Sequence, residues 1–448
     1  MSIDTVMFVP GICGSVLKEG DQTIWPGTPA DKVFQSYPDE FVHILSTSKT
    51  IVASDVLRDV PLTVLGVTVH HFSAYGGVLN ALRGMGYSEP GGTLIPFAYD
   101  WRQDVRASAR LLHSRLSDDD LKGRRVAIVA HSMGGLVARH ALEKLGMPDG
   151  VRIELLALLG TPHLGAPVAL QNVLGLRPEL FLSAKQCGDA LKNPDFPSGY
   201  QLLPRPGVPA LLAQNAQTGF SILNAFSPPV STQFELANAS LEAARQLSTD
   251  LPFLGPDFHP PCAYLAIAGN AQKTVVANYQ INETATPIDE DNSGDGTVPL
   301  WSAAPPGVPV RYVAAAHLEM CADPDTIAML RAVLRPDLPG GRLFNASPGI
   351  ASLSVQPLKT SVVPGESFTV TVVADRPTQT IDTNVVFQRV FDNNQSDSQI
   401  VPVHYQGGPT RSISLEFTAP DERAVLLFAV QDDANVPQGK LGSVLVVT

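Results

Sequence analysis

Apolar runs of strand length alternate with segments of helical periodicity over most of the chain. The apolar runs are TVMFVPG (5–11), TLIPFAYDW (93–101), RRVAIVAHS (124–132), IELLALLG (153–160), AYLAIAG (263–269) and VRYVAAAH (310–317). Between the second and third runs, apolar residues recur at the spacing of one helix face, at Val105, Ala109, Leu112 and Leu116. Strands this apolar, alternating with helices, predict an α/β fold whose mostly parallel sheet is covered on both faces.

Two stretches depart from this alternation. Residues 165–260 are rich in Pro, Leu and Phe with weak periodicity, and we interpret them as a helical cap inserted over the sheet; a packed insertion without function is the alternative. After the helix predicted at 323–335, a Pro- and Gly-rich linker leads into short segments of alternating apolar and polar residues. We therefore expect an α/β domain at 1–336 and an immunoglobulin-like β-sandwich at 348–448.

The composition narrows the choice of partners. Of the 448 residues, 44% are hydrophobic and 17% are charged, and the formal net charge is -12. This acidic balance argues against nucleic acid as a partner and against docking on anionic lipid by charge alone, but it leaves an apolar, lipid-like substrate open. The cysteines form no CxxC pair, and no histidine cluster has zinc spacing. We expect free thiols in a reducing compartment, no metal site and no cofactor.

Targeting signals are not evident in the sequence. No run approaches the roughly 20 apolar residues of a membrane-spanning helix. The first residues, MSIDTVMFVPG, lack the basic start of a secretory signal and already have the pattern of a strand. The sequence predicts a cytoplasmic protein with at most transient membrane contact, or a secreted one whose N-terminal leader has been removed.

The segment VAIVAHSMGGLVARH (126–140) carries the strongest chemical signal. Ser132 lies on the turn between a predicted buried strand and a predicted helix, which is the nucleophile elbow that lifts a serine hydroxyl above the sheet edge. The usual pattern is G-x-S-x-G; here Ala130 replaces the first glycine, and Gly134 keeps the second. Because alanine is also small, we expect Ser132 to be a nucleophile.

A serine nucleophile needs a base, and the base needs an orienting carboxylate. In the elbow-containing fold the chain order is Ser, acid, His. Asp295 lies between glycines in GDGTVP, and His317 ends the last apolar run, so we expect them to be the acid and the base. The competing carboxylates, at Asp289, Glu290 and Asp291, are interpreted as a solvated acidic loop in which a calcium site is only weakly signalled.

Two other histidines lie near these motifs. His131 immediately precedes Ser132 and is interpreted as a packing or hydrogen-bonding neighbour. His163, in LLGTPHLGAP, follows an apolar run and is expected to line the pocket mouth, where it would contact substrate.

The oxyanion of an acyl-transfer intermediate needs two convergent N–H donors. One would come from Met133, the residue after the nucleophile. The other would come from Ile12 in FVPGICGS (8–15), where Gly11 lets the backbone turn. An ordinary turn is the alternative for this segment.

Several motifs together resemble the lecithin:cholesterol acyltransferase family of α/β-hydrolases, with its lysosomal phospholipase and bacterial relatives. They are VPGICGS, YDWR, AHSMGG, LLGTPHLGAP, GDGTVP and AAAHLEM, in this order, and they span about residues 5–335. The resemblance implies an α/β-hydrolase fold and places the nucleophile, acid and base on Ser132, Asp295 and His317. It also implies Ile12 and Met133 as oxyanion donors, and a site wall formed by the YDWR residues, with Trp101 contacting substrate.

The expected function is hydrolysis or transfer of an acyl group from a lipid-like ester. A carboxylesterase or amidase with a non-lipid substrate is the alternative, and a binding protein with a degenerate hydrolase core is a third reading. Secreted members of the family carry a disulfide-closed lid loop early in the chain, whereas this chain has no cysteine pair between residues 20 and 100. The C-terminal sandwich is foreign to the family pattern, and we expect it to bind a protein or a glycan.

Overall fold

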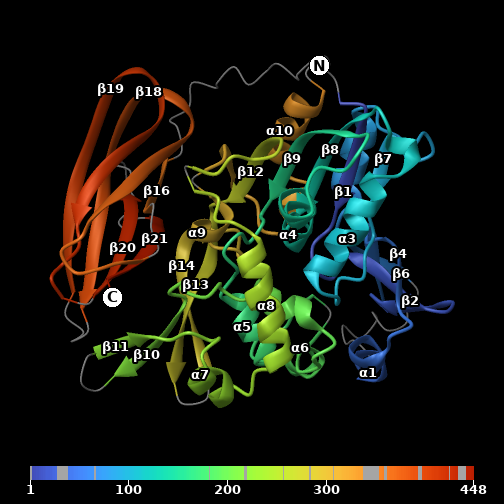
Figure 1. The fold of residues 1–448 in the computed structure, drawn as a ribbon, viewed down its shortest axis with the longest axis horizontal. Helices are drawn as coiled ribbons and strands as arrows, with labels where there is room; N and C mark the ends of the chain where they lie inside the picture. The colour runs from blue at the N-terminus through green and yellow to red at the C-terminus, as the bar shows by residue number, and fades with distance from the viewer. Residues whose placement is uncertain are drawn as a thin grey trace.

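The computed structural model describes residues 3–27, 39–64, 67–180, 182–215, 219–255, 257–281, 284–305, 307–335, 353–357, 361–391, 396–422, 424–431 and 440–447 (Figure 1). Its central element is a six-stranded sheet in the order β15-β12-β9-β8-β1-β7. Every neighbouring pair in this sheet is parallel. The strands are β1 (Thr5–Val9), β7 (Leu94–Pro96), β8 (Arg125–His131), β9 (Arg152–Leu159), β12 (Ala263–Gly269) and β15 (Val310–Val313).

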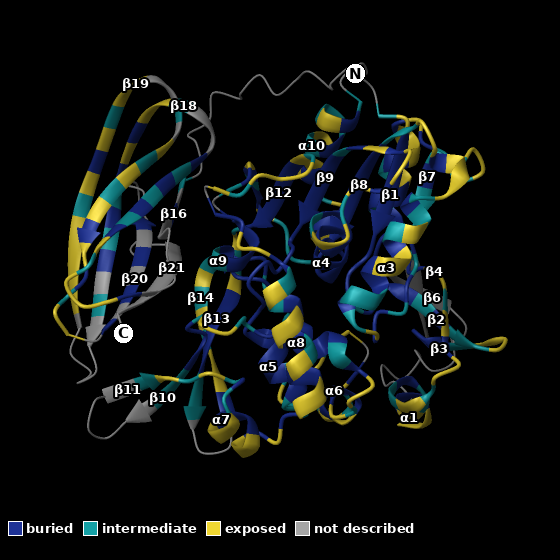
Figure 2. Cartoon of the chain, in the orientation of Figure 1, coloured by how far each residue is buried: buried dark blue, intermediate teal, exposed yellow. Residues whose placement is uncertain are grey.

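Both faces of this sheet are buried, and alternate residues of β1 enter different cores. Met7 and Val9 lie in one core together with residues of α3 (Val105–Leu116) and α4 (Met133–Arg139). Val6 and Phe8 lie in a second core, with residues of α2 (Gly76–Gly84) and α10 (Pro324–Leu334). In Figure 2 the sheet is dark blue, whereas α3 also shows an exposed face. Burial on both faces explains the uninterrupted apolar runs, and the predicted parallel sheet with covering helices is confirmed.

The segment between β9 and β12 is only partly helical. It contains α5 (Val168–Val173), α6 (Ala184–Leu191), η4 (Pro197–Leu202), β10 (Leu211–Asn215), β11 (Gly219–Ile222), α7 (Pro228–Gln233) and α8 (Asn238–Asp250). The β10–β11 hairpin joins a second hairpin, β13 (Gln272–Ile281) and β14 (Thr284–Gly294), in a four-stranded sheet. The predicted helical insertion therefore also contributes strands. Residues 289–291, predicted to be a solvated loop, instead belong to β14.

Smaller elements surround the amino-terminal part of the sheet. A three-stranded sheet consists of β2 (Ser15–Glu19), β3 (Gln22–Trp25) and β4 (Val52–Val56), and α1 (Asp39–Thr47) lies between β3 and β4 in the chain. The antiparallel pair β5 (Asp59–Val64) and β6 (Val67–Ser73) leads into α2. Short helical turns follow α3 and α4 at η2 (Asp119–Leu121) and η3 (His140–Lys144), and α9 (Leu300–Ala303) and η5 (Glu319–Cys321) flank β15.

The carboxyl-terminal region is a curled, mainly antiparallel sheet, drawn in orange and red in Figure 1. The long strand β18 (Ser367–Phe391) pairs with β16 (Leu353–Pro357), β19 (Ser396–Thr418) and β20 (Ala424–Gln431). Strand β21 (Lys440–Val447) pairs with β20 and with β17 (Ser361–Val362). The core of this carboxyl-terminal region contains four aromatic rings that contact one another, those of Phe368, Phe387, Phe417 and Phe428. The predicted β-rich region is thus confirmed, while an immunoglobulin-like strand arrangement stays a prediction.

The predicted boundary between the two regions lies outside the described residues. Helix α10 ends at Leu334, and the described chain resumes at 353. Within the described ranges, no helix combines the length and the apolar character needed to cross a bilayer.

Candidate active site

Ser132 lies on a strained turn between β8 and α4. Its φ is 53° and its ψ is −127°, values that a residue with a side chain rarely adopts. The turn is held by a hydrogen bond of 2.8 Å from the Ser132 N–H to the Leu159 carbonyl on β9. Strain of this kind is the mark of a nucleophile elbow, because the sharp turn lifts the hydroxyl off the sheet.

Glycines around Ser132 allow the backbones to approach one another. A Cβ added to Gly134 would lie 2.3 Å from the Pro10 carbonyl oxygen, and one added to Gly11 would lie 2.8 Å from the Ser132 Cβ. Neither position has room for a side chain. The turn after β1 therefore packs directly against Ser132 and the start of α4.

The structure brings Ser132, His317 and Asp295 together. The His317 Nε2 lies 2.9 Å from the Ser132 Oγ, and the His317 Nδ1 lies 2.7 Å from the Asp295 Oδ2. Ser132 and Asp295 are 6% and 1% exposed, so little water competes for these contacts. The three side chains come from loops that follow three different strands.

Asp295 is held as a hydrogen-bond acceptor on both of its carboxylate oxygens. Its Oδ1 accepts from the N–H groups of Thr297 (3.0 Å) and Val298 (2.7 Å), which leaves Oδ2 for His317. The His317 N–H donates to the Asp295 carbonyl at 2.8 Å, so the two loops are also joined through their backbones. A Cβ on Gly160 would lie 3.0 Å from the Asp295 Oδ2, so β9 also ends directly against this pair.

The surroundings of His317 act on its pKa in opposite directions. Burial favours the neutral ring, but the charge of Asp295 and the hydrogen bond to it favour the imidazolium, with a smaller contribution from Glu179. The net result is a pKa raised above the ordinary value of 6.5. A base with this environment can hold a proton taken from Ser132.

The turn after β1 is a hydrogen-bonded four-residue turn. The Gly14 N–H donates to the Gly11 carbonyl at 3.1 Å, and Cys13, in the third position, has a φ of 59°. A positive φ in that position is characteristic of a type II turn. Because the peptide bond is planar and trans, the Ile12 N–H points opposite to the Gly11 carbonyl and therefore away from Gly14.

The N–H groups of Ile12 and Met133 are available as donors. Within the described part of the chain, neither donates to a protein acceptor. Ile12 lines the same cavity as Ser132 and His317, and Met133 is the first residue of α4, where the helix leaves N–H groups unpaired. Ile12 therefore lies at the cavity beside Ser132, and Met133 directly follows Ser132 in the chain; their role as oxyanion donors stays a prediction.

A cavity of about 610 Å³ opens beside Ser132 and His317. The segment between β9 and β12 supplies much of its wall. Most of the lining is apolar, and the side chains that give it this character include Trp101, Val168, Leu182, Leu191, Phe196 and Leu202. Glu179 and Asn172 also line it and are joined by a hydrogen bond of 3.0 Å.

The YDWR segment supports one wall of this cavity. Trp101 is fully buried, and its indole N–H donates to the Ser15 carbonyl at 3.0 Å. Arg102 forms an ion pair of 2.7 Å with Asp100 and donates to the carbonyls of Leu45 and Ser48. Trp101 also lines the cavity, and its contact with substrate stays a prediction.

His163 does not line this cavity. It is 3% exposed, and its Nδ1 lies 3.2 Å from the Arg139 guanidinium, which is paired with Glu143. Burial, and then the charges of Arg139 and Arg205, lower its pKa well below the ordinary range. The expectation that His163 lines the pocket mouth is corrected accordingly, because the loop after β9 turns this ring toward α4.

The competing carboxylates are also away from His317. Asp289 and Asp291 are exposed residues of β14, and Asp289 is paired with Lys273 at 3.4 Å. No group of acidic, histidine or cysteine side chains in the described ranges could hold a metal ion. All four cysteines are free, and Cys13 and Cys187 line the cavity.

One residue near the site was missed by the sequence analysis. Tyr75, directly before α2, lines the cavity and hydrogen-bonds to both Gly11 and His131. No sequence motif marks it, because its contacts are 64 and 56 residues away along the chain.

Comparison with solved structures finds likenesses at low sequence identity. The crystal structure of the lin2722 gene product from Listeria innocua is 14% identical, with 76% of this chain and 96% of that chain covered and a TM-score of 0.29. Phospholipase PlaB from Legionella pneumophila is 12% identical, with 96% and 86% covered and a TM-score of 0.36. RedJ, a thioesterase of prodiginine biosynthesis in Streptomyces coelicolor, is 18% identical, with 60% and 82% covered and a TM-score of 0.26.

These TM-scores are too low for the likenesses to carry an argument about activity. No curated protein sequence matches the chain at a significant level. A family model does match: residues 64–214 correspond to the family described as lecithin:cholesterol acyltransferase. The matched residues include Trp101 and Ser132. Over residues 64–214 this match confirms the similarity to the lecithin:cholesterol acyltransferase family that the sequence motifs indicated.

Proposed function

We propose that this protein is a serine-dependent acyl hydrolase or acyltransferase of the α/β-hydrolase fold, acting on a lipid-like ester. The observation that carries the proposal is the position of His317, 2.9 Å from the Ser132 Oγ and 2.7 Å from the Asp295 Oδ2. The match to the lecithin:cholesterol acyltransferase family supports the same class of reaction.

In the proposed mechanism the Ser132 Oγ attacks the acyl carbonyl carbon while the His317 Nε2 takes the hydroxyl proton. The carbonyl π electrons move to oxygen, and the N–H groups of Ile12 and Met133 stabilise the resulting oxyanion. Asp295 keeps the proton on Nδ1 and stabilises the imidazolium. The oxyanion then collapses, the bond to the leaving alcohol breaks, and His317 returns its proton to that alcohol.

The second half of the reaction repeats the same steps with a different nucleophile. Water or a second alcohol gives a proton to His317 as its oxygen attacks the carbonyl carbon of the acyl-Ser132 ester. The bond from that carbon to the Ser132 Oγ then breaks, His317 returns the proton to the Ser132 Oγ, and a free acid or a new ester is released. Both outcomes use the same residues, so the proposal covers hydrolysis and transfer alike.

The apolar cavity supports a lipid-like acyl group. Its wall beside Ser132 consists largely of aliphatic and aromatic side chains such as Leu191 and Phe196, which stabilise a long acyl chain by removing it from water. A carboxylesterase or amidase with a small non-lipid substrate is the alternative. Turnover of p-nitrophenyl esters of increasing acyl length separates the two: higher kcat/KM for long chains supports the proposal, and a preference for acetate contradicts it.

Ser132→Ala tests the nucleophile itself. Ser240→Ala is the matched control, because Ser240 is also buried and its hydroxyl has no hydrogen-bond partner in the described part of the chain. We expect a fluorophosphonate to label wild type and Ser240→Ala but not Ser132→Ala, and ester turnover to disappear with the label. Equal turnover by Ser132→Ala and wild type would exclude the mechanism.

For the carboxyl-terminal region we propose an immunoglobulin-like module that binds a protein or a glycan. Its described core is apolar and aromatic, which supports a packing or recognition role over a catalytic one. Removing residues 348–448 and measuring both p-nitrophenyl ester turnover and binding to a glycan array tests this. Loss of catalysis in a folded truncated protein would contradict it.

A further inference from the structure

A chain of three hydrogen bonds, two of them fully buried, joins the turn after β1 to the loop that carries His317. The Gly11 N–H lies 2.9 Å from the Tyr75 hydroxyl oxygen, and this oxygen lies 2.9 Å from the His131 Nδ1. The His131 Nε2 lies 2.9 Å from the His317 carbonyl oxygen. Tyr75 and His131 are each 2% exposed. The chain thus links the proposed oxyanion turn, the residue before the nucleophile and the residue proposed as base.

With a neutral His131 ring, every proton in this chain has one consistent position. A carbonyl can only accept, so the His131 Nε2 must carry the hydrogen that faces His317. A backbone N–H can only donate, so the Tyr75 oxygen accepts from Gly11 and uses its own hydrogen for the His131 Nδ1. His131 then carries its single ring hydrogen on Nε2. Burial, and then the neighbouring His317, lower its pKa well below the ordinary range, in agreement with this assignment.

The rest of Tyr75 is anchored to the same turn from the other side. Its N–H is bonded to the carbonyls of Leu57 and Arg58, and the Leu57 N–H donates to the Gly14 carbonyl at 2.9 Å. Gly14 in turn donates to Gly11. The Tyr75 hydroxyl thus holds the turn at Gly11, and the Leu57 N–H holds it at Gly14. The Leu57 carbonyl also accepts from the Tyr75 N–H, so the two contacts are connected.

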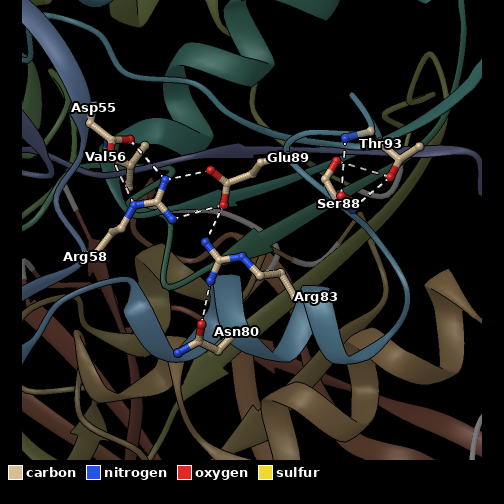
Figure 3. A network of polar contacts seen from close by, with 9 residues as sticks. Asp55, Val56, Arg58, Asn80, Arg83, Ser88, Glu89 and Thr93 are labelled. Atoms are coloured by element: carbon tan, nitrogen blue, oxygen red, sulfur yellow. Dashed lines mark hydrogen bonds and ion pairs between the residues drawn. The ribbon is translucent and has the colours of Figure 1, made fainter.

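Arg58 is itself fixed by the ion pairs drawn in Figure 3. Its guanidinium is paired with Glu89 at 2.8 Å and with Asp55 at 3.2 Å, and Glu89 also pairs with Arg83 of α2. These contacts tie the segment after β4 to the end of α2.

We propose that Tyr75 and His131 are positioning residues that hold the Ile12 N–H and the His317 ring in place relative to Ser132. The inference rests on the proposed function, since it assigns these residues to that same site. Neither residue exchanges a proton with substrate. Their effect reaches the reaction through Gly11, whose peptide with Ile12 carries the proposed oxyanion donor, and through the backbone of His317.

Tyr75→Phe removes the central hydroxyl and little else. Tyr87→Phe is the matched control: its hydroxyl is also buried and donates to a backbone carbonyl, that of Leu334 at 3.2 Å, but Tyr87 does not line the cavity. We expect Tyr75→Phe to lower kcat by about 10- to 100-fold with KM within about twofold, because misplacing a group that acts only in the transition state leaves substrate binding intact. Tyr87→Phe is expected to keep both constants.

Two further readouts separate positioning from a merely structural role. Binding of an alkyl boronic acid, which forms a tetrahedral adduct on Ser132, should weaken by the same factor as kcat/KM in Tyr75→Phe and stay unchanged in Tyr87→Phe. Hydrogen exchange of the peptide covering residues 8–15 should quicken only in Tyr75→Phe, and this readout does not depend on catalysis.

His131→Gln removes the hydrogen bond between Tyr75 and His131 from the other partner. The glutamine amide can still donate to the His317 carbonyl, but its acceptor oxygen is attached to Cδ and does not occupy the Nδ1 position that faces Tyr75. Combined with Tyr75→Phe it should add little further loss of kcat, because both substitutions break one interaction. If Tyr75→Phe does not fold, His131→Gln takes its place in the comparison with Tyr87→Phe.

The outcomes are distinguishable. Equal kcat per fluorophosphonate-titrated site in Tyr75→Phe and Tyr87→Phe, or equal exchange of residues 8–15 in both, overturns the positioning role. Failure of the proposed function would appear in the wild-type protein instead, as ester turnover no greater than that of Ser132→Ala.

Discussion

The parallel sheet and the carboxyl-terminal sheet place their loops differently, and the loops of the first bring Ser132 and His317 together. All strands of the central sheet run in the same direction, so the loops that follow β1, β8 and β15 meet at one edge. Ile12, Ser132 and His317 lie on those loops. In the carboxyl-terminal sheet the strands are mostly antiparallel, so successive loops go to opposite ends. A parallel arrangement therefore gathers residues that are distant in sequence at a single edge.

The two regions also bury different kinds of side chain. The cores beside the parallel sheet enclose polar groups that are held by hydrogen bonds, such as His131 and Asp295. In the described part of the carboxyl-terminal region the core is formed mainly by aliphatic residues and phenylalanines, and ion pairs such as that between Arg389 and Asp397 lie at the surface. Substitutions should therefore alter chemistry in the first region and stability in the second.

The largest effect is expected for Asp295→Asn. The Thr297 and Val298 N–H groups would keep the amide oxygen at the Oδ1 position and turn the NH₂ group toward His317. The ring would then carry its hydrogen on Nε2, facing Ser132, and could not take the serine proton. We expect kcat to fall by about 10⁴-fold, as for the equivalent change in serine proteases. Asp291→Asn, an exposed neighbour on β14, should keep wild-type turnover; a similar loss there would point to another acid.

Phe428→Ala should destabilise the carboxyl-terminal sheet by about 3–5 kcal/mol without changing the site. Phe428 is fully buried, and its ring lies 5.0 Å from that of Phe387. Denaturant unfolding would measure the loss, and p-nitrophenyl ester turnover would measure the site. Ile400→Ala, which removes an exposed apolar side chain from the same sheet, is the control and should be neutral. Reduced turnover at an intact parallel sheet would show that the two regions are coupled.

Gly134→Ala should disrupt the packing beneath Ser132. The new Cβ would lie 2.3 Å from the Pro10 carbonyl oxygen, and overpacking of this kind costs about 1–3 kcal/mol. Because the strain falls on the turn after β1, kcat should fall together with stability. Gly84→Ala, at the end of α2 with no atom within 4 Å of its added Cβ, should be neutral or slightly stabilising. Full activity in Gly134→Ala would mean that this turn is not needed in its present position.

On the acid side of its pH profile, kcat/KM should fall with an apparent pKa above 6.5. Asp295 raises the pKa of His317, and only the neutral ring can act as base. The same pair contributes stability that is complete below the unfolded-state pKa and is lost as the pH rises through the folded-state value. His131 acts in the opposite sense: its lowered pKa makes the folded state lose stability as the pH falls below about 6.5. An apparent pKa below 6.5 for the acid limb of kcat/KM would contradict the role assigned to Asp295.

Cys13→Gly should have the smallest effect. Glycine suits the φ of 59° at this position, and the relief of strain, about 1 kcal/mol, offsets the loss of a small buried side chain. Burial raises the pKa of the Cys13 thiol well above its ordinary value, so the thiol stays protonated and unreactive. Activity should stay within about twofold of wild type. A loss as large as that of Ser132→Ala would identify Cys13 as a reacting group.

Local sequence patterns were sufficient to predict the central strands that lead to Ser132 and His317. The apolar runs predicted the central strands, and Ser132 and His317 could be placed because each directly follows such a run. Asp295 was found from its glycine-flanked motif alone. The long β13–β14 hairpin that separates it from β12 was missed, because its strands carry polar residues and lack the continuous apolar pattern of a buried strand.

Side-chain environments were beyond the reach of those patterns. His163 follows an apolar run just as His317 does, yet it packs against Arg139 whereas His317 faces Ser132. Nothing in the local sequence distinguishes the two, because the outcome depends on which way each loop turns after the strand ends. Tyr75 escaped for the same reason.

Strand and helix periodicity, and the small residues around Ser132, follow from interactions between neighbours in the chain, so the order of the elements and the identity of the elbow can be inferred without coordinates. The contact between Asp295 and His317 and the link through Tyr75 and His131 each join residues far apart in sequence. Such contacts depend on how the loops pack after the sheet has formed, and packing is a property of the whole folded chain.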